Sequence, residues 1–271
     1  MINDDTRLKE VLMGKDILIL ENVNCGYDSS SVVNDISFVL QTGEHLCILG
    51  ANGCGKTTIL KAISGILPYN GEINLVGSGS LRNLKRKNIA KRIAMMSQIT
   101  NVHFPYTIFE TVMMGRYVYM PSGLAGPSAQ DKEVVMRCLK EVGLFDMQNK
   151  SIASISGGQM QRVLLARCFA QEPDIILLDE PTNHLDFKYQ IELLNYLRNW
   201  SSTESRAIIG VLHDINLALE FADKILVMKQ GRMLSYNDVS NTMRSDVLNQ
   251  TYGIDVKKQM TNFYRRWEEF L

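Results

Sequence analysis

Gly50-Ala51-Asn52-Gly53-Cys54-Gly55-Lys56-Thr57 is the stretch of this sequence that decides the fold. It fits the pattern G-x-x-x-x-G-K-[ST] at every fixed position. The run before it, residues 46–49, is apolar throughout, which is typical of a strand covered on both faces. After it, apolar residues recur at helical spacing across residues 59–66. A strand, a glycine-rich turn and a helix in this order predict a loop that holds a phosphate group.

The parts of this P-loop have different roles toward a nucleotide. Its glycines let successive backbone N–H groups point at phosphate oxygens, and the helix N-terminus adds a positive dipole end. The pattern places the Lys56 ammonium at the β- and γ-phosphates and the Thr57 hydroxyl on Mg²⁺. The predicted nucleotide-binding residues here are Gly50, Asn52, Gly53, Cys54, Gly55, Lys56, Thr57 and Thr58.

Cys54 permits two interpretations. It lies beside Lys56 and a helix N-terminus, and both features lower the pKa of a thiol and favour the reactive thiolate. One hypothesis is therefore a reactive Cys54 that a bound nucleotide protects. The other is an inert small residue at a variable position of the loop.

A second motif carries the chemistry. Asp174-Ile175-Ile176-Leu177-Leu178-Asp179-Glu180 is an apolar strand that ends in two acids. Asp179 is predicted to hold the shell of Mg²⁺, directly or through water. Glu180 is predicted to act as the general base for the attacking water. The plain alternative is a pair of solvated acids in a turn, but the P-loop elsewhere in the chain favours catalysis.

The order of expected elements indicates an α/β fold. Residues 17–96 contain strand-like runs, about 97–163 read mainly as helix, and the remainder returns to alternating strands and helices. Such alternation predicts a mostly parallel sheet covered on both faces. We expect one domain over residues 1–271, with its core in 1–96 and 164–271 and a helical insert at 97–163.

Composition restricts the classes of function. Lys+Arg and Asp+Glu both number 29, and this balance argues against nucleic acid as a partner. The basic run at residues 82–87 is interpreted as a solvated helix face. No apolar stretch approaches the roughly 20 residues of a membrane-spanning helix, and the polar N-terminus is unlike a secretory signal. The five scattered cysteines suggest reduced thiols of a cytosolic protein.

Ile155-Ser156-Gly157-Gly158-Gln159 narrows the choice among P-loop proteins. It resembles the signature motif of ABC ATPases, usually Leu-Ser-Gly-Gly-Gln, with Ile155 in place of leucine. The resemblance implies a RecA-like core with an N-terminal antiparallel β subdomain and an inserted α-helical subdomain. It also implies that Ser156, Gly157, Gly158 and Gln159 clamp the γ-phosphate of ATP held by a second subunit, so that two chains make each site.

Other family motifs follow in order. Tyr27 matches the aromatic residue that stacks on adenine, although it could be a plain surface residue. Gln98 matches the Q-loop glutamine, which touches Mg²⁺ or the attacking water. Asn183-His184-Leu185-Asp186 matches the D-loop, whose Asp186 lies at the dimer seam near the nucleotide. His213 matches the switch histidine at the γ-phosphate, or is only a buried, satisfied histidine.

The segment 104–117 resembles the ATPase subunits of iron–siderophore, haem and cobalamin importers, and so do residues 180–186 and 251–256. This resemblance implies a homodimer on the cytoplasmic face of the membrane, attached to a polytopic permease and served indirectly by a substrate-binding protein. Two interpretations remain for three residues of this segment: they form the apolar floor of the cleft that receives the permease, or they are core residues of the helical insert. These residues are Met113, Met114 and Tyr117. The alternative function is a soluble ABC ATPase acting on a cofactor-assembly scaffold or on nucleic acid.

Overall fold

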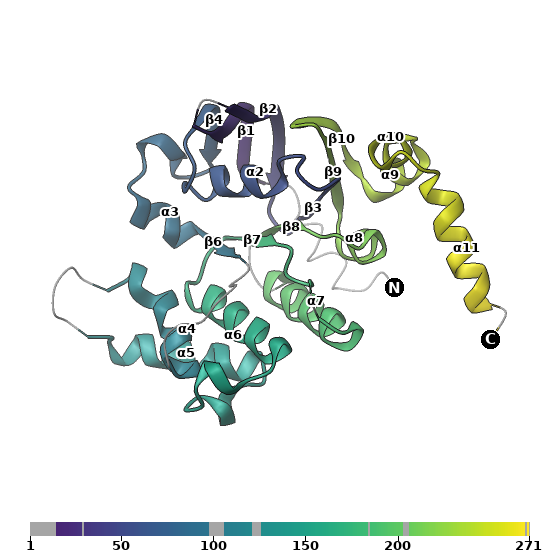
Figure 1. Cartoon of the computed structure of the whole chain (residues 1–271). Helices are drawn as coiled ribbons and strands as arrows, with labels where there is room; N and C mark the ends of the chain where they lie inside the picture. The colour runs from purple at the N-terminus through teal and green to yellow at the C-terminus, as the bar shows by residue number, and fades with distance from the viewer. Residues whose placement is uncertain are drawn as a thin grey trace, which may run out of the picture.

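The computed structural model describes residues 15–28, 30–97, 106–120, 126–183, 185–202, 206–268 and 270. A six-stranded sheet crosses the middle of the molecule, with a four-stranded sheet on one side and a group of helices on the other (Figure 1). This is the P-loop NTPase architecture with an antiparallel β subdomain and a helical subdomain, as the sequence predicts.

The larger sheet has the strand order β10-β9-β3-β8-β7-β6, and every pair in it is parallel except β10 with β9. Its strands are β3 (His45–Gly50), β6 (Ile93–Met96), β7 (Ile175–Asp179), β8 (Ala207–Val211), β9 (Lys224–Lys229) and β10 (Arg232–Asp238). The phosphate-binding loop and the acidic strand end both follow carboxyl ends of parallel strands, which lie at one edge of the sheet.

This sheet separates two hydrophobic cores, and β7 shows how. Ile175 and Leu177 belong to the core beneath the antiparallel sheet, whereas Ile176 and Leu178 belong to the core shared with the helices below. All four side chains are fully buried. A strand buried on both faces must be apolar at every position, which explains the unbroken apolar runs of β3 and β7.

The smaller sheet is antiparallel and has the order β2-β1-β4-β5. Its strands are β1 (Asp16–Tyr27), β2 (Ser30–Gln41), β4 (Tyr69–Leu75) and β5 (Gly79–Ser80). Helix α2 (Lys56–Ile63) packs between the two sheets and buries Ile59, Ala62 and Ile63 as its spacing predicts. The helical pattern extended one turn too far, because Ile66 lies beyond the end of α2 and is 63% exposed.

The second region of the chain is helical in the part that the structure describes. It contains α4 (Ile108–Met113), η2 (Met114–Val118), α5 (Ala129–Glu141), η3 (Phe145–Met147), η4 (Ile152–Ser154) and α6 (Gly157–Ala170). Thr107, Ser128 and Ser156 each begin a helix with a capping box, in which the hydroxyl accepts from the third helical N–H. Helix α6 is continuous across residue 163, so a boundary drawn there would cut a helix.

Arg116 fastens this helical group to the core. Its guanidinium lies within η2, donates from Nε to Asp131 of α5 at 3.0 Å, and donates from Nη1 to Glu172 at 2.7 Å. Nη1 also donates to the carbonyl of Ala170 at 2.8 Å, and Tyr119 covers the guanidinium at 4.1 Å. One buried cation therefore joins η2, α5 and the turn that leads from α6 into β7.

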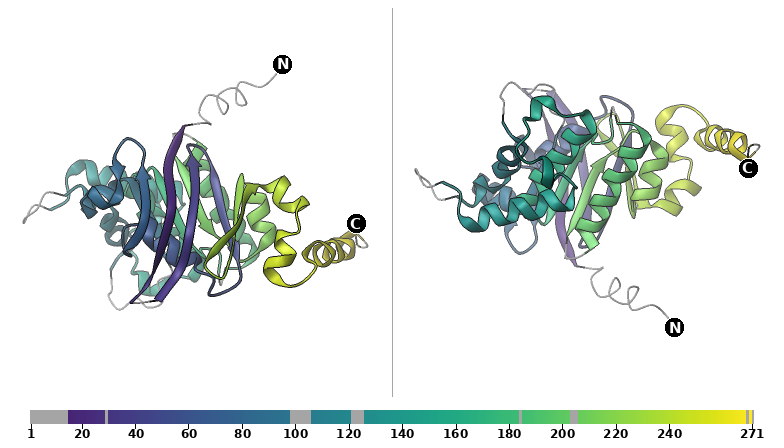
Figure 2. Two further views of the ribbon diagram at one scale, coloured as in Figure 1. Left: turned by 90° about the horizontal axis from the view of Figure 1, so that it is seen from above. Right: turned by 90° about the horizontal axis from the view of Figure 1, so that it is seen from below.

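The remaining helices surround the large sheet and extend the chain at its C-terminal end (Figure 2). They are η1 (Leu81–Asn83), α3 (Arg86–Arg92), α7 (Phe187–Ser202), α8 (Ile215–Phe221), α9 (Val239–Arg244), α10 (Val247–Tyr252) and α11 (Val256–Glu268). Among the described helices, none has both the length and the apolar character that crossing a bilayer requires.

Candidate functional site

The phosphate-binding loop owes its shape to glycines at the end of β3. Gly50 ends the strand against β9, where an added Cβ would meet the Met228 carbonyl oxygen at 2.4 Å. Gly55 caps α2 with a φ of 103°, a left-handed conformation that other residues rarely adopt. The turn therefore directs the N-terminus of α2 and its free N–H groups toward the loop.

Lys56 lies inside this loop. Its side chain is buried, and Nζ donates to the carbonyls of Gly50 at 2.8 Å and Ala51 at 3.1 Å. A buried ammonium needs oxygen partners, and the loop's own carbonyls supply them. The charge is thus held where an anionic ligand of the loop would meet it.

Thr57 connects the loop to the acidic end of β7. Its hydroxyl donates to Oδ1 of Asp179 at 2.8 Å. Burial raises the pKa of Asp179, and the neighbouring Glu180 carboxylate raises it further, while Thr57, Lys61 and Lys56 pull it down. A carboxylate that burial destabilises has a strong preference for a cation beside it.

Glu180 is fixed from three directions. Its backbone has a φ of 54°, which is uncommon for a residue other than glycine, and its N–H donates to the Val211 carbonyl at 3.1 Å. Oε1 lies 2.6 Å from Nε2 of His213, and Oε2 accepts from Nδ2 of Asn183 at 2.7 Å. Because β7 pairs with β8 in register Asp179↔Val211, residues far apart in sequence meet at one point.

These groups surround one cavity of about 410 Å³. Its lining comprises Val32, Asn52, Gly53, Gly55, Lys56, Thr57, Thr58, Glu180, Asn183 and His213. Eight of these are predicted site residues, and the structure brings them together. Sequence reasoning did not single out Val32 or Asn183 as site residues. Asn183 lies within the 180–186 run, so its place in the sequence was a usable signal. Val32 belongs to β2, and its carbonyl meets Gly55 of the loop only in the folded chain.

The structure favours the inert interpretation of Cys54 over the reactive-thiol hypothesis. Only 5% of the residue is exposed, and burial raises the pKa of its thiol despite the opposing effect of Lys56. The sulfur lies under the loop, where a Cβ added at Gly50 would stand 2.7 Å from it. Cys54 therefore fills space beneath the phosphate-binding turn, as the inert interpretation has it.

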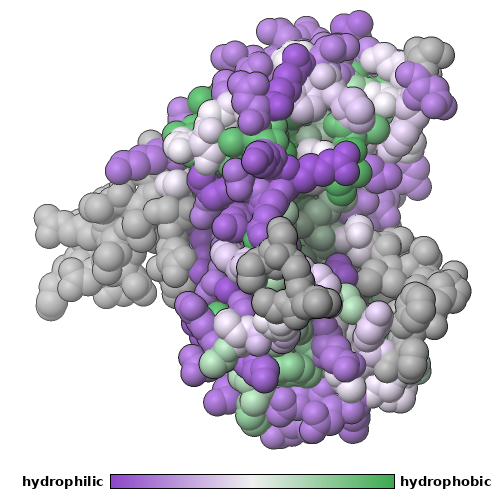
Figure 3. All heavy atoms as spheres, turned by 90° about the vertical axis from the view of Figure 1, so that its left-hand side faces the viewer, coloured by the Kyte–Doolittle hydropathy of each residue, from purple (hydrophilic) through white to green (hydrophobic). Residues whose placement is uncertain are grey.

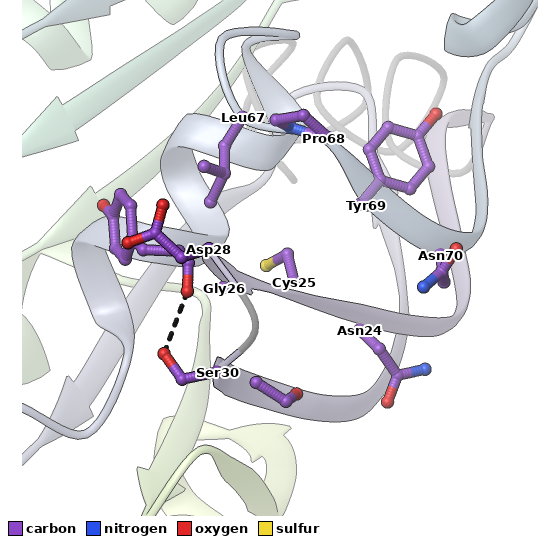
Figure 4. Close-up of a pocket in the computed structure, with 11 residues that line it drawn as sticks. Asn24, Cys25, Gly26, Asp28, Ser30, Leu67, Pro68, Tyr69 and Asn70 are labelled. Atoms are coloured by element: carbon purple, nitrogen blue, oxygen red, sulfur yellow. Dashed lines mark hydrogen bonds between the residues drawn. The ribbon is translucent and has the colours of Figure 1, made fainter.

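Tyr27 ends β1 and is 42% exposed. Lys61 of α2 donates to its hydroxyl at 3.2 Å and lies 5.5 Å from its ring centre. Beside it is a cavity of about 620 Å³ between the end of β1 and the start of β4 (Figure 4). Figure 4 labels Leu67, Pro68, Tyr69 and Asn70 on one side of this cavity and Asn24, Cys25 and Ser30 on the other. Tyr27 thus offers an aromatic face outside the phosphate cavity.

The signature residues lie elsewhere. Ser156 and Gly157 are exposed at the start of α6, and Gln159 completes the capping box, with its Oε1 accepting from the Ser156 N–H at 3.0 Å. Gly158 packs against the ring of Tyr189 so closely that a Cβ would stand 2.9 Å from it. None of these four residues lines the phosphate cavity of its own chain.

Two further predicted residues differ in what the structure says of them. Asp186 precedes α7, and its Oδ1 accepts from the Tyr189 N–H at 3.1 Å, outside the phosphate cavity. Gln98 lies outside the described residues, as does His184. Of the described residues, no cluster of three or more His, Cys, Asp or Glu side chains is placed to hold a metal by itself.

Comparison with known proteins agrees with this geometry. The sequence model of the ABC transporter family matches residues 33–183. The chain is 31% identical to the iron(3+)-hydroxamate import ATP-binding protein FhuC of Bacillus subtilis, covering 89% of each chain. It is 34% identical to the hemin import ATP-binding protein HmuV of Jannaschia sp., covering 88% of this chain and 87% of that one.

A solved structure extends the likeness to three dimensions. It is described as a metal-chelate type ABC transporter in an inward-facing conformation, and it superimposes with a TM-score of 0.77 at 28% identity. The match covers 88% of this chain and 90% of that one. The chain therefore belongs to the ABC transporter family, in which it is an ATP-binding subunit with ATPase activity.

Proposed function

We propose that the chain binds MgATP in the 410 Å³ cavity and hydrolyses it as a homodimer that drives a membrane permease for a metal chelate or corrinoid. The observation that carries the proposal is the position of Glu180. Its carboxylate is fixed by His213 and Asn183 in the same cavity as Lys56 and Thr57. A base, a phosphate-binding cation and a hydroxyl ligand in one cavity suit phosphoryl transfer to water.

The triphosphate would enter along the N-terminus of α2. Free N–H groups of the turn and the helix dipole favour its negative charge. Lys56 now donates to the carbonyls of Gly50 and Ala51 and would exchange them for β- and γ-phosphate oxygens. Thr58 lines the same cavity one residue further along the helix. Tyr27 would stack on the adenine through its exposed ring.

The residues present also fit Mg²⁺. This ion takes oxygen ligands and is held by one or two protein groups plus phosphates and water. The oxygens of the Thr57 hydroxyl and the Asp179 carboxylate lie 2.8 Å apart, and both are oxygen ligands of the kind that Mg²⁺ takes. When bound, the ion would neutralise charge on the phosphates and offset the free-energy cost of burying the charged carboxylate of Asp179. Gln98 stays a predicted third contributor.

Glu180 would take a proton from the attacking water as the water oxygen bonds to the γ-phosphorus. The bond from that phosphorus to the ADP oxygen breaks in the same displacement, and ADP and inorganic phosphate result. His213 holds Oε1 and Asn183 holds Oε2, so the carboxylate cannot rotate away from the cavity. His213 would act as a positioning residue for Glu180 and as a contact for the γ-phosphate.

The position of the signature residues supports dimerisation. Ser156 and Gly157 expose the N-terminus of α6, a helix of 14 residues, yet they do not line their own chain's cavity. An exposed helix N-terminus favours an anion. We infer that it meets the γ-phosphate held by a second copy, with Asp186 at the seam between the two chains.

The permease would dock at the end of the molecule that carries α3, α4 and α5, which faces the viewer in Figure 3. Tyr117 in η2 is 60% exposed and suits an interface. Met114 is half-buried, but Met113 is 6% exposed and belongs to the core. Met113 therefore does not belong to the apolar surface that the sequence suggested for the permease, because its side chain points from α4 into the core.

The proposed class of transported substrate is inferred from the relatives of this chain. Names of hydroxamate and hemin importers among them support a metal chelate, and the importer-like segment 104–117 supports the same class. The test is uptake in a strain deleted for this gene, with labelled iron chelates, haem and cobalamin compared. Loss of one uptake activity, restored by the wild-type gene and not by Lys56→Ala, is expected. Undiminished uptake of all three, with no second system present, would refute the importer assignment and leave the ATPase intact.

A further inference from the structure

The charges of this chain are unevenly distributed along the sequence. Residues 73–130 contain seven Lys and Arg and one acid, Glu110, so this segment has a net charge of +6. The whole chain has a net charge of zero, so the remaining residues together carry −6. A protein divided in this way presents a positive face if the segment folds to one side.

The structure gathers most of these cations around α3. Arg82 lies in η1, Lys85 precedes α3, and Arg86, Lys87 and Lys91 lie within it. We call these five side chains the basic face. Four of them are exposed and Lys91 is half-buried. A solvated helix face accounts for this exposure but not for the absence of acids among them.

The basic face keeps its positive charge. Nζ of Lys87 donates to the carbonyl of Met120 at 2.7 Å, and Nζ of Lys91 lies 5.2 Å from the ring centre of Tyr119. Neither a carbonyl nor an aromatic ring neutralises an ammonium. In the part of the chain that the structure describes, no Asp or Glu forms an ion pair with any of the five cations.

The other two cations of the segment are neutralised. Arg92 pairs with Asp174, and the buried Arg116 pairs with two acids. The uncompensated positive charge of the segment therefore lies on the basic face. Ile89 is 5% exposed and holds α3 against the core beneath the antiparallel sheet, so the position of this face is fixed.

We propose that the basic face lies against anionic lipid headgroups of the membrane. The inference goes beyond the proposed function and takes from it only which end of the chain meets the membrane. Helix α3 contacts η2, and Figure 1 places it at the same end as α4 and α5, where the permease is proposed to dock. Anionic lipids give the cytoplasmic leaflet a negative surface potential that attracts clusters of Lys and Arg. The same surface repels the negative remainder of the chain, so the charge separation orients the molecule.

Two other partners fit this face less well. Cytoplasmic loops of membrane proteins carry an excess of Lys and Arg, so the underside of a permease would repel the basic face. Nucleic acid extends beyond a single patch and would meet the negative remainder of the chain, whereas a flat membrane touches one side only. Three of the five cations are lysines, whose flexible point charges suit mobile headgroups. The lipid surface is therefore the better partner.

Flotation of the full chain with vesicles, without nucleotide or permease, tests the proposal. The chain should bind vesicles of phosphatidylcholine with about 40% phosphatidylglycerol and should not bind vesicles of phosphatidylcholine alone. Each cation near an anionic membrane strengthens binding roughly 5-fold, so Lys85→Gln, Arg86→Gln and Lys87→Gln together should weaken it on the order of 10²-fold. About 0.5 M NaCl should release the wild type, because salt shortens the range of the charges.

A matched variant separates the location of the charge from its amount. Lys258→Gln, Arg265→Gln and Arg266→Gln remove three exposed cations from α11, which Figure 1 places at the other end of the molecule. This variant has the same net charge as the first and should bind nearly as the wild type does. Both variants should keep the wild-type Tm, because all six side chains are exposed.

Equal loss of binding in the two variants would overturn the proposal, and so would equal binding of the wild type to both kinds of vesicle or binding to neither. Release by about 10 mM inorganic phosphate at constant ionic strength would show a discrete anion site instead. Tighter binding to a short DNA duplex would point to nucleic acid, and either result contradicts a lipid surface. The rate of ATP hydrolysis is measured separately, so its failure would count against the proposed function and leave this inference standing.

Discussion

Arg116→Met should destabilise the nucleotide-free chain by about 2–3 kcal/mol. The substitution keeps an unbranched apolar stem but removes the cation that joins η2, α5 and the turn before β7. Loss of one partner from a buried ion pair costs about 3–5 kcal/mol when the other is left uncompensated. We expect the smaller loss of about 2–3 kcal/mol because Glu172 is 36% exposed and Asp131 keeps its hydrogen bonds from Ser128.

Thermal unfolding followed by circular dichroism measures the effect. For a chain of this size each kcal/mol shifts Tm by about 2–4 °C, so a fall of roughly 4–12 °C is expected. Arg137→Met is the matched control, because Arg137 also pairs with Glu172 at 2.8 Å but is 58% exposed. It should cost about 0–1 kcal/mol. Equal shifts for the two variants would refute the reasoning from burial.

The same network has a pH dependence. Bonds from Ser128, and after them the Arg116 guanidinium, hold the pKa of Asp131 below its ordinary value. Ionised Asp131 therefore stabilises the fold above about pH 4, and this contribution disappears as the pH falls through the lowered pKa. The difference in Tm between the wild type and Arg116→Met should narrow in acid. A difference independent of pH would show that Met causes strain rather than loss of charge.

Three further substitutions examine the site. Burial raises the pKa of Asp179, so the ionised carboxylate destabilises the folded chain at neutral pH. Asp179→Asn should therefore raise the Tm of the nucleotide-free chain. The same substitution should lower Mg²⁺-dependent hydrolysis on the order of 10²-fold. A lower Tm would contradict that sign. Cys54→Ala should keep the wild-type kcat. Maleimide should inactivate the folded wild type slowly, because the thiol of Cys54 is buried and burial raises its pKa. Rapid inactivation that Cys54→Ala abolishes would refute the inert role of Cys54. Tyr27→Ala should raise the KM for ATP roughly 5–100-fold at similar kcat, since stacking contributes about 1–3 kcal/mol, and an unchanged KM would exclude Tyr27 from adenine binding.

The fold could be predicted from sequence where its cause is local. The P-loop and the apolar strand before Asp179 each depend on a few consecutive residues, and both occur where their patterns place them. The end of α2 was harder to predict, because Ile66 continues the apolar spacing although the chain turns away after Ile63. Helix spacing alone does not indicate where a turn of glycine and proline takes over.

Errors arose where a side chain depends on distant segments. The pKa of Cys54 follows from burial beneath a loop that packs on β9, more than 170 residues away in sequence, so neighbours in the chain suggested the wrong direction. Met113 is buried because α4 packs against α5 and α6. The Arg116 network also joins three separate segments.

The rate of ATP hydrolysis by Glu180→Gln tests the central claim most directly. Glutamine keeps the shape of the side chain and its oxygen still accepts from Nδ2 of Asn183, but it does not accept the proton of the attacking water. With ATP binding intact, turnover should fall by a factor on the order of 10²–10⁴, or roughly 3–5 kcal/mol of activation free energy. Wild-type turnover in a folded, ATP-binding Glu180→Gln chain would contradict the account.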